Sequence, residues 1–354
     1  MNRKTLIAVL ACAAVLPGAA RAELAVYGQL QAELARVSND GFGENYTGGK
    51  RTPVATGETA IKLADNRRGR LGVKLREDLG LGLAAIARFE WQVNTVAADP
   101  NDGRREAWVG LAASWGEIKA GRLRTPYKYT GGVNYDPFAY TYLEVRLSGG
   151  MKGGPYGQNG FWDTSLSYRK QWGGFGLWVA YGLDQGNGTT NTPSNDNGGN
   201  AGDLSAALTY RGHNWELFVA GNRFDADNDG GNDSVTKLGG RLELAGRHTF
   251  SAQLELDNPD GNNNNARIGF LGYQFRINKN IIAAQFGRTD GDANYAVTPA
   301  PGALAERRID TTYYALGVIH RFTPQTRIFA GYRKSAGKDN NDLTVYSAGL
   351  RIDF

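Results

Sequence analysis

Apolar and polar residues alternate along almost the whole chain, as they do in β-strands that present one face to an apolar environment. The final segment, YSAGLRIDF, is typical: Tyr346, Ala348, Leu350, Ile352 and Phe354 alternate with small or charged residues. The same period of two recurs in segments that begin near residues 24, 70, 85, 162, 204 and 250. No segment with a helical period competes with it, so the sequence predicts an all-β fold.

The connections between the predicted strands alternate strictly between short and long. Seven are tight turns, with the sequences EDLGLG, ASWGE, QWGGFG, RGHNW, AGRHT, INKN and RFTPQT. Eight are longer and span residues 37–60, 95–103, 126–160, 184–202, 224–234, 257–266, 289–311 and 335–342. Together these connections join 16 strands, and both chain ends fall on the short-turn side. This layout predicts a 16-stranded antiparallel transmembrane β-barrel with short periplasmic turns and long external loops.

A soluble β-sandwich is the alternative all-β fold, because its strands also alternate between apolar and polar residues. A sandwich has no reason to sort its loops by length, whereas an outer-membrane barrel does. Aromatic residues near the ends of predicted strands would also suit the girdles of a barrel at the membrane interfaces. Those residues are Trp91, Trp162, Trp172 and Tyr210.

The N-terminus has the features of a secretory signal peptide: the basic start MNRK, the apolar run TLIAVLACAAVLPG and the cleavage site ARA. We expect residues 1–22 to be removed and residues 23–354 to form a single barrel domain. The only cysteine, Cys12, lies in this leader, so the exported chain would contain no disulfide. Lipidation of Cys12 is disfavoured, because Leu10 is bulky where a small residue is expected.

Composition excludes two further classes of protein. Three of the 40 basic residues lie in the leader, which leaves 37 basic against 35 acidic residues without the clustered excess that nucleic-acid binding needs. No apolar run of about 18 residues follows the leader, so the chain is not a helical membrane protein. The 49 glycines, 17 tyrosines and 7 tryptophans agree with a β protein rich in turns.

A barrel of 16 strands is too wide to be filled by side chains and holds an aqueous channel. The longest connection, 126–160, is a candidate for narrowing that channel, because it is less polar than the others and rich in aromatic rings. These rings belong to Tyr127, Tyr129, Tyr135, Phe138, Tyr140 and Tyr142. A loop in water gains nothing from six aromatic residues, whereas a loop folded against the inner wall buries them. We therefore expect an inward-folded constriction loop, with an exposed surface loop as the alternative.

Several segments resemble the Gram-negative general porins of the betaproteobacterial type. RREAWVGLAASWGEIKAGRLRTPY is similar to the strands before the constriction loop of that family, and NRRGRLGVKLREDLGLGLAAIARFE is similar to the preceding hairpin. YYALGVIHRFTPQTRIFAGY and AGLRIDF are similar to its last three strands. The resemblance implies a homotrimeric pore in the outer membrane, in contact with lipid and lipopolysaccharide, for passive diffusion of small hydrophilic solutes and ions. It implies no cofactor.

The resemblance also implies a set of pore residues, since the family places arginines on one pore wall opposite acids on or near the constriction loop. The matching basic residues are Arg70, Arg105 and Arg146, with Lys74 and Arg76 on the same predicted strand face as Arg70. The matching acids are Glu90 and Asp136. Alternation does not decide whether Arg105 faces the lumen or the lipid, because Trp108 and Val109 are adjacent apolar residues and only one of them can face the lipid. The excess of basic residues predicts a preference for anions; alternatively, the arginines only pair with acids along the wall.

The chain ends on an aromatic residue in the middle of a strand pattern. An open sheet edge is not viable in lipid, so the last strand must close on the first. Ser347, Gly349, Ile352 and Phe354 resemble the signal that the barrel-assembly machinery reads, although an aromatic residue is usual at position 352.

The sequence was also searched for a calcium site, for a hydrolase active site and for signs of a substrate-specific channel. The segment DADNDG at 225–230 begins like a calcium-binding loop, but Thr236 stands where a glutamate is needed, so we expect a polar external loop and no resident metal. His213, His248 and His320 are far apart, and no Gly-x-Ser-x-Gly motif occurs, so an outer-membrane lipase or protease is disfavoured. A substrate-specific channel for a phosphate or carboxylate solute would use the same arginines as a general pore.

Overall fold

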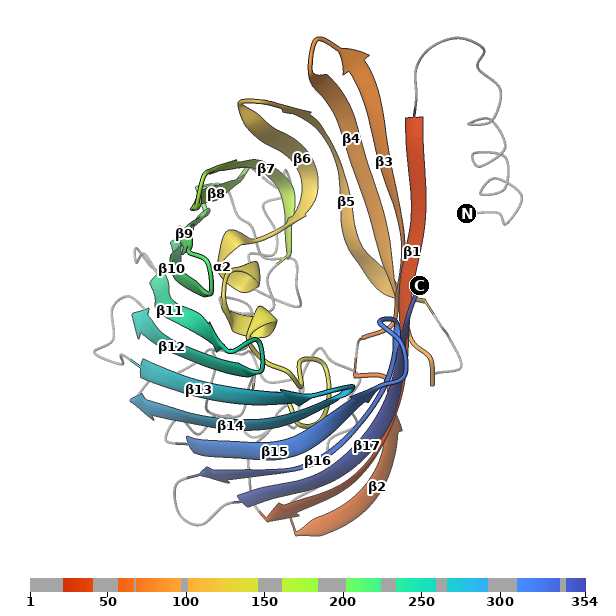
Figure 1. The fold of residues 1–354 in the computed structure, drawn as a ribbon, viewed down its shortest axis with the longest axis vertical. Helices are drawn as coiled ribbons and strands as arrows, with labels where there is room; N and C mark the ends of the chain where they lie inside the picture. The colour runs from red at the N-terminus through yellow and green to blue at the C-terminus, as the bar shows by residue number, and fades with distance from the viewer. Residues whose placement is uncertain are drawn as a thin grey trace, which may run out of the picture.

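The strands of the protein form one antiparallel sheet that closes on itself. The computed structural model describes residues 22–40, 57–66, 68–96, 101–145, 161–183, 202–223, 234–258, 266–291, 311–337 and 342–354. Within these ranges β1 pairs with both β2 and β3, each strand from β3 onward pairs with the next one in the chain, and β17 pairs with β1. The ribbon therefore surrounds a central lumen, with the short helix α2 inside it (Figure 1).

The described ranges contain 17 strand segments and two short helical turns. The strands are β1 (Ala22–Asp40), β2 (Glu58–Ala64), β3 (Arg70–Gly80), β4 (Leu83–Val93), β5 (Asn101–Ala113), β6 (Gly116–Arg124), β7 (Phe161–Trp172), β8 (Phe175–Gly182), β9 (Leu204–Arg211), β10 (Trp215–Arg223), β11 (Ser234–Leu244), β12 (His248–Asn258), β13 (Ala266–Ile277), β14 (Asn280–Gly291), β15 (Thr311–Arg321), β16 (Thr326–Gly337) and β17 (Asp342–Asp353). The helical turns are α2 (Pro126–Tyr129) and η2 (Gly132–Asn134). None of the described helices is long and apolar enough to cross a membrane.

Two of the 17 segments are halves of one barrel strand. β1 pairs with β3 through residues 22–29 and with β2 through residues 33–39. The break between the halves includes Asn66, which has a φ of 52°, and Gly69, where a Cβ would lie 2.0 Å from the carbonyl oxygen of Val93. With β2 and β3 counted as one, the barrel has the 16 strands that the sequence predicts.

The predicted sorting of the connections by length is confirmed. Each of the seven tight turns joins two neighbouring strands, from β3–β4 to β15–β16. Each of the eight longer connections begins and ends within a few residues of its predicted position, and antiparallel pairing places the strand ends that they join at the opposite end of the barrel. The two ends of the barrel are called here the short-turn end and the long-loop end.

The seam between the first and last strands extends to the final residue. Gly28 N donates to the carbonyl oxygen of Phe354 at 2.8 Å, and Phe354 N donates to the carbonyl oxygen of Gly28 at 2.9 Å. The Phe354 ring lies directly over Gly28, where a Cβ would come within 2.3 Å of it. In Figure 1 the C-terminus accordingly lies beside β1. The C-terminal aromatic residue therefore occupies a defined place in the closed sheet.

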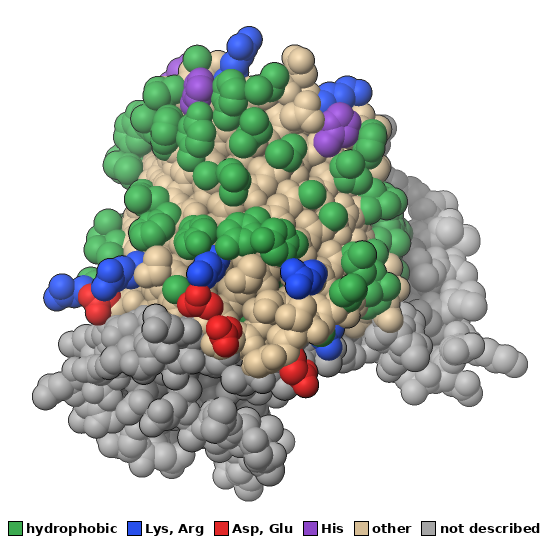
Figure 2. Space-filling view, turned by 90° about the horizontal axis from the view of Figure 1, so that it is seen from below, with side chains coloured by type: hydrophobic (Ala, Val, Ile, Leu, Met, Phe, Trp, Pro, Cys, Tyr) green, Lys and Arg blue, Asp and Glu red, His purple; other side chains and the backbone are tan. Residues whose placement is uncertain are grey.

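The outer face of the barrel is apolar. The outward residues of the last strand, Tyr346, Leu350, Ile352 and Phe354, are between 40% and 58% exposed, while Arg351 points inward and is buried. Figure 2 shows hydrophobic side chains over the middle of one face, with charged side chains gathered toward its rims. An apolar surface this extensive is foreign to a water-soluble monomer and suits a lipid environment.

Aromatic rings form a girdle at the short-turn end. Trp172, Phe175, Tyr210 and Trp215 make consecutive ring contacts, with centroid separations of 6.3, 4.5 and 5.1 Å. Trp172 and Tyr210 are thus exposed at one end of the barrel, as the predicted girdle requires, whereas Trp91 is half-buried beside Phe89.

The girdle position predicted for Trp162 is wrong. Its side chain is fully buried among the residues of the interior. The pairing of β6 with β7 shifts register between Gly121 and Leu123, and Thr164 has a φ of 43°. A bulge of this kind turns the residues before it to the opposite face, so the alternation read from Leu166 back to Trp162 fails.

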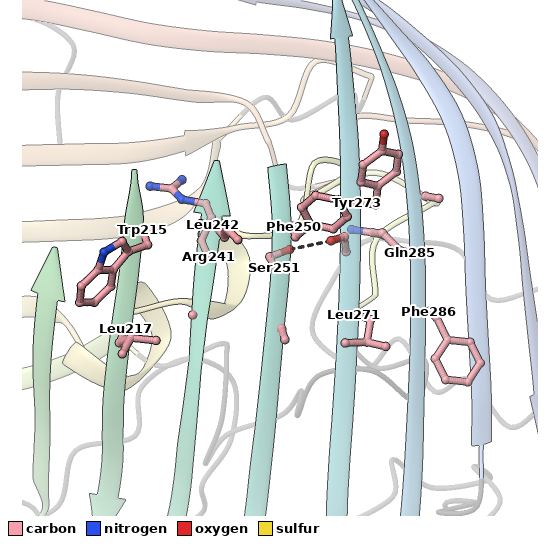
Figure 3. Close-up of a pocket in the computed structure, with 14 residues that line it drawn as sticks. Trp215, Leu217, Arg241, Leu242, Phe250, Ser251, Leu271, Tyr273, Gln285 and Phe286 are labelled. Atoms are coloured by element: carbon pink, nitrogen blue, oxygen red, sulfur yellow. Dashed lines mark hydrogen bonds between the residues drawn. The ribbon is translucent and has the colours of Figure 1, made fainter. Parts of the chain in front are cut away.

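The outer wall is indented across β10–β14. Small outward residues, Gly240, Ala252 and Ala284, lie between larger ones such as Leu217 and Leu271, and they leave a groove of about 880 Å³ (Figure 3). The groove faces outward and is separate from the lumen, where the charged residues gather.

Deleting Phe354 should impair assembly of the barrel, because it removes two backbone hydrogen bonds of the seam and the ring over Gly28. The measurement is the amount of heat-modifiable folded protein in the outer membrane, with conductance of the surviving channels recorded separately. Phe286→Ala, which removes another exposed outward ring, is the matched control. Normal amounts of folded protein in the deletion variant would refute this role.

Candidate functional site: an arginine wall opposite an inward loop

The segment that follows β6 folds into the lumen. It begins with the helical turn α2, in which Pro126 occupies the first position and the Thr125 hydroxyl accepts from Lys128 N at 3.3 Å. All six aromatic side chains expected to be buried are buried or half-buried. The inward fold is therefore confirmed for residues 126–145, which are called here the inward loop. Residues 146–160, including Arg146, lie outside the described residues.

The first half of the inward loop is held by polar side chains of β9–β12. Tyr127 donates its backbone N–H to Ser205 Oγ at 3.1 Å and its hydroxyl to Glu255 at 3.0 Å. Gly132 N donates to Gln253 at 2.7 Å. Gly131, just before it, has a φ of 57°, and a Cβ there would lie 2.2 Å from the Phe218 ring. Glycine thus lets the inward loop lie close against the wall.

The second half is held by β15–β17 and β1. On the β1 side, Gln31 donates to the carbonyl oxygen of Tyr140 at 2.7 Å, and Glu33 accepts from Tyr142 N at 2.9 Å. Further donors to loop carbonyl oxygens are Arg333 on β16, Arg351 on β17 and the Tyr313 hydroxyl on β15. The inward loop is therefore fastened to the wall from β9 round to β1, and β2–β8 make up the rest of the circumference.

Asp136 lies inside this loop. Its carboxylate accepts from Phe138 N at 2.8 Å, from Val145 N at 3.0 Å and from Gln285 on β14 at 2.6 Å. Burial raises the pKa of Asp136 to about 6, against the opposing effect of these hydrogen bonds. Among the described residues Asp136 makes no ion pair with Arg70 or Arg105; its hydrogen bonds stabilise the turn of the loop.

Glu90 on β4 is the centre of a cluster of guanidinium groups. Its fully buried carboxylate lies 2.7 Å from Arg88, 2.7 Å from Arg105, 3.4 Å from Arg124 and 3.9 Å from Arg70. These residues come from β3, β4, β5 and β6, which stand side by side in the sheet. Arg70, Arg105 and Glu90, predicted from the sequence, are therefore brought together, and this surface is called here the arginine wall.

A second carboxylate of the arginine wall was missed by sequence reasoning. Glu106 on β5 lies 3.0 Å from Arg88 and 2.9 Å from Arg124. Arg122, also unpredicted, is 2.9 Å from Asp163 on β7. Period-two alternation could have found Arg88, because it is two positions before Glu90 and shares its strand face.

A bulge settles the position of Arg105. The pairing of β4 with β5 shifts register between Glu90 and Trp91, and Arg105 lies at this irregularity. Val109 is 65% exposed on the outer face, so Trp108 and Glu106 face the lumen. Simple alternation would place Arg105 outside, whereas the bulge lets it reach Glu90 from the inside.

Lys74 and Arg76 share the inward face of β3 with Arg70, but among the described residues neither forms an ion pair with Glu90. Six residues of strand separate Arg76 from Arg70, which corresponds to about 20 Å. Both side chains are exposed, and Lys74 lies 4.6 Å from the centroid of the Tyr27 ring. They extend the positive surface toward the short-turn end.

The arginine wall has donors that its own carboxylates do not satisfy. The Nη2 atoms of Arg70 and Arg105 are buried and donate no hydrogen bond within the part of the chain that the structure describes. Two rings of the inward loop cover the edges of the wall, with Tyr129 4.4 Å from Arg124 and Tyr140 5.4 Å from Arg70. Four guanidinium groups thus share two carboxylates beside the aromatic edge of the loop, an arrangement that favours anions.

No cluster of three or more histidine, cysteine, aspartate or glutamate side chains among the described residues could hold a metal ion. The segment at 225–230 that begins like a calcium-binding loop lies outside the described residues.

Comparison with known proteins assigns the family. The model of the Gram-negative porin family matches residues 8–340. The chain belongs to the Gram-negative porin family. A segment of 132 residues of this porin is 34% identical to the major outer membrane protein P.IB of Neisseria meningitidis, and it covers 37% of each chain. The porin thus matches only about a third of the length of that relative.

Solved structures show the same fold at low sequence identity. The anion-selective porin from Comamonas acidovorans superposes with a TM-score of 0.71 and 18% identity, over 94% of this chain and 100% of that one. The trimer form of OmpT from Vibrio cholerae superposes with a TM-score of 0.60 and 13% identity, over 94% and 99% of the two chains. Family membership and the apolar outer face place the porin in the outer membrane.

Replacing Glu90 by glutamine should destabilise the porin by about 3–5 kcal/mol, because it leaves four clustered guanidinium groups without their central carboxylate. The measurement is the free energy of unfolding in denaturant. Glu117→Gln is the control, since Glu117 is 39% exposed and its ion pair among the described residues is with Lys119 on the same strand. We expect a loss below about 1 kcal/mol for it. Equal losses in the two variants would contradict a central role for Glu90.

Asp136 should make stability depend on pH in a defined direction. Its pKa of about 6 in the folded protein lies above that of an exposed aspartate. The stabilising contribution is therefore greatest below pH ~4 and is lost as the pH rises toward about 6. Relative to Asp136→Asn, the wild-type porin should lose about 3 kcal/mol of unfolding free energy between pH ~3.5 and ~7. A difference that is constant with pH would contradict the raised pKa.

Proposed function

We propose that this porin forms a water-filled channel through which small hydrophilic solutes and ions diffuse across the outer membrane, with a preference for anions. The observation that supports it most is the arginine wall: Arg70, Arg88, Arg105 and Arg124 converge on only two carboxylates, Glu90 and Glu106. The buried Nη2 atoms of Arg70 and Arg105 have no acceptor among the described residues, which supports an excess of positive charge on this wall.

The selectivity follows from charge in a confined space. Charges beside a low-dielectric protein wall act on an ion more strongly than the same charges in bulk water. Rings of charged side chains set the ion preference of a pore, and guanidinium groups favour anions. Lys74 and Arg76 would extend this field toward the short-turn end.

The inward loop would supply the constriction. Its hydrogen bonds to β9–β17 and β1 hold it rigidly, so the passage is bounded by the loop on one side and by the arginine wall on the other. In this proposal Asp136 acts indirectly, because it holds the loop in shape. Arg146, which lies outside the described residues, is kept in the basic cluster on the strength of the sequence resemblance alone. We propose no catalytic activity for the porin.

The proposed assembly is a homotrimer in contact with outer-membrane lipid and lipopolysaccharide. The similarity of the fold to a porin solved as a trimer supports it. Insertion by the barrel-assembly machinery would use the terminal strand, with Ser347, Gly349, Ile352 and Phe354 as the signal. Gly349 also has a role in packing, since a Cβ there would lie 2.4 Å from the Phe329 ring.

The experiment is the reversal potential of the purified porin in a planar bilayer under a KCl gradient. We expect stepwise conductance and a reversal potential of the sign that chloride permeation gives. Arg70→Gln and Arg105→Gln should each move the chloride-to-potassium permeability ratio toward unity, because each removes one positive charge from the wall. The control is Arg267→Gln, which removes the same charge from an outward position on β13. A clear cation preference of the wild type would refute the proposal.

A further inference from the structure

The groove across β10–β14 lies on the outer wall, in the half of the barrel nearer the short turns. Its volume is about 880 Å³, within the range of small-molecule sites (Figure 3). Its first row of side chains lies within four residues of the short-turn ends of the strands, and strand pairing places these side chains next to one another. They are Trp215, Leu242, Phe250, Tyr273 and Ala284.

The second row is where the wall is hollow. Gly240 and Ala252 lie opposite each other, with the larger Leu217 and Leu271 on either side of them. A hydrocarbon chain in this hollow contacts protein atoms on several sides, whereas a chain on a flat wall contacts them on one. Dispersion attraction grows with the number of such contacts. The groove can therefore hold one alkyl chain more firmly than a flat part of the outer wall can.

The two short turns next to the groove are basic. The β11–β12 turn contributes Arg247 and the β13–β14 turn contributes Lys279, and both side chains are exposed. Lys279 Nζ donates to a backbone carbonyl oxygen at 3.2 Å, and neither turn contains an acid. Glu243 precedes the first turn but faces the lumen, because Leu242 and Leu244 on either side of it face outward. The rim of the groove is therefore positively charged.

Arginines at other short turns have acids beside them. At the β9–β10 turn Arg211 pairs with Glu216, and at the β15–β16 turn Arg327 pairs with Asp353 of β17. The β3–β4 turn, EDLGLG, begins with two acids. Basic turns without acids are therefore not a general property of this end of the barrel, and their position next to the groove is informative.

Between the hollow and the basic turns lies a band of rings that carry polar atoms. His248 occupies the outward position two residues before Phe250, and its ring stacks on Phe275 at a centroid separation of 4.8 Å. Its Nδ1 atom lies 2.9 Å from the Tyr273 hydroxyl. Rings with one polar end are the side chains that occupy a membrane interface. The outer surface thus changes from an apolar hollow through polar rings to cations, in the order in which a phospholipid changes from acyl chain through ester to phosphate.

The dimensions of the site agree with one leaflet of a bilayer. Ala252 is four residues from His248, which corresponds to about 14 Å along an antiparallel strand. Half of the hydrocarbon core of a bilayer is about 15 Å thick. A lipid with its phosphate at the basic turns therefore has an acyl chain long enough to occupy the hollow.

We propose that the groove and its basic rim form a site for one anionic phospholipid of the periplasmic leaflet. Arg247 and Lys279 bind the phosphate through charge-assisted hydrogen bonds, and one acyl chain lies in the hollow beside Ala252. An anionic headgroup is favoured over a zwitterionic one, because the rim offers two cations and no acid. The occupant is a phospholipid rather than lipopolysaccharide, because the site adjoins the short periplasmic turns. The site is outside the channel and does not depend on its ion selectivity.

The test is lipid binding to the folded porin in detergent micelles, measured by native mass spectrometry. Dioleoylphosphatidylglycerol is the anionic probe, and dioleoylphosphatidylcholine, with the same acyl chains, is the zwitterionic one. We expect one phosphatidylglycerol per chain to bind more tightly than phosphatidylcholine. Arg247→Gln and Lys279→Gln should each weaken phosphatidylglycerol binding roughly tenfold, the loss expected for one charge-assisted hydrogen bond. The matched control is Arg276→Gln, which removes the same charge from an inward position at the same end of β13.

Filling the hollow tests the position of the acyl chain. Ala252→Leu should weaken the binding of both lipids, whereas Ala120→Leu, which enlarges an outward alanine on β6 outside the groove, should not. Equal affinity of the wild type for the two lipids would overturn the proposed anionic headgroup. An equal loss in Arg247→Gln and Arg276→Gln would overturn the basic rim, and unchanged binding in Ala252→Leu would overturn the groove as the site of the chain.

Discussion

The structure depends on one constraint: in lipid, every backbone N–H and C=O must find its partner within the protein. A sheet satisfies it only by closing, and the pairing of β1 with β17, down to the exchange between Gly28 and Phe354, completes the closure. Closing 16 strands leaves a lumen that wall side chains alone cannot fill. That lumen gives the inward loop a place to bury its aromatic rings. The barrel, the hollow interior and the inward loop are thus successive consequences of the same requirement.

The lumen also explains how the arginine wall can exist. A carboxylate as buried as that of Glu90 is tolerable only when paired and hydrogen-bonded, and four guanidinium groups and the Tyr27 hydroxyl meet that need. The guanidinium groups, in contrast, have too few acceptors, because two carboxylates cannot satisfy the donors of four arginines. Aromatic faces meet part of the remaining demand, as Tyr129 does for Arg124. The structural ion-pair cluster and the surface that we propose selects anions are therefore one arrangement.

The sequence predicted the strands, their faces and the sorting of the loops, because period two and turn residues are local properties. It failed where a tertiary contact breaks the period. Trp162 was assigned to the lipid face, but the irregularity at Thr164 turns it inward. Arg105 was ambiguous for the same reason, since its position depends on the bulge between β4 and β5. The sequence placed Asp136 in the inward loop but could not predict its contacts. Its hydrogen bonds join residues up to 149 positions apart, and no pattern along the chain encodes them.

The inward loop and the arginine wall are linked through the distribution of charge. A loop without regular secondary structure leaves backbone N–H groups and hydroxyls that need acceptors. Glu33, Glu216 and Glu255 supply them from the barrel wall beneath the loop, and Asp136 and Glu144 do so from within it. Lys237, Arg333 and Arg351 on that side lie under the loop, against its aromatic rings or its carbonyl oxygens, so they offset these acids only in part. The acids that hold the loop are thereby kept away from β3–β6, where the arginines exceed their carboxylates. The same placement of acids thus both fastens the loop and creates a field across the lumen.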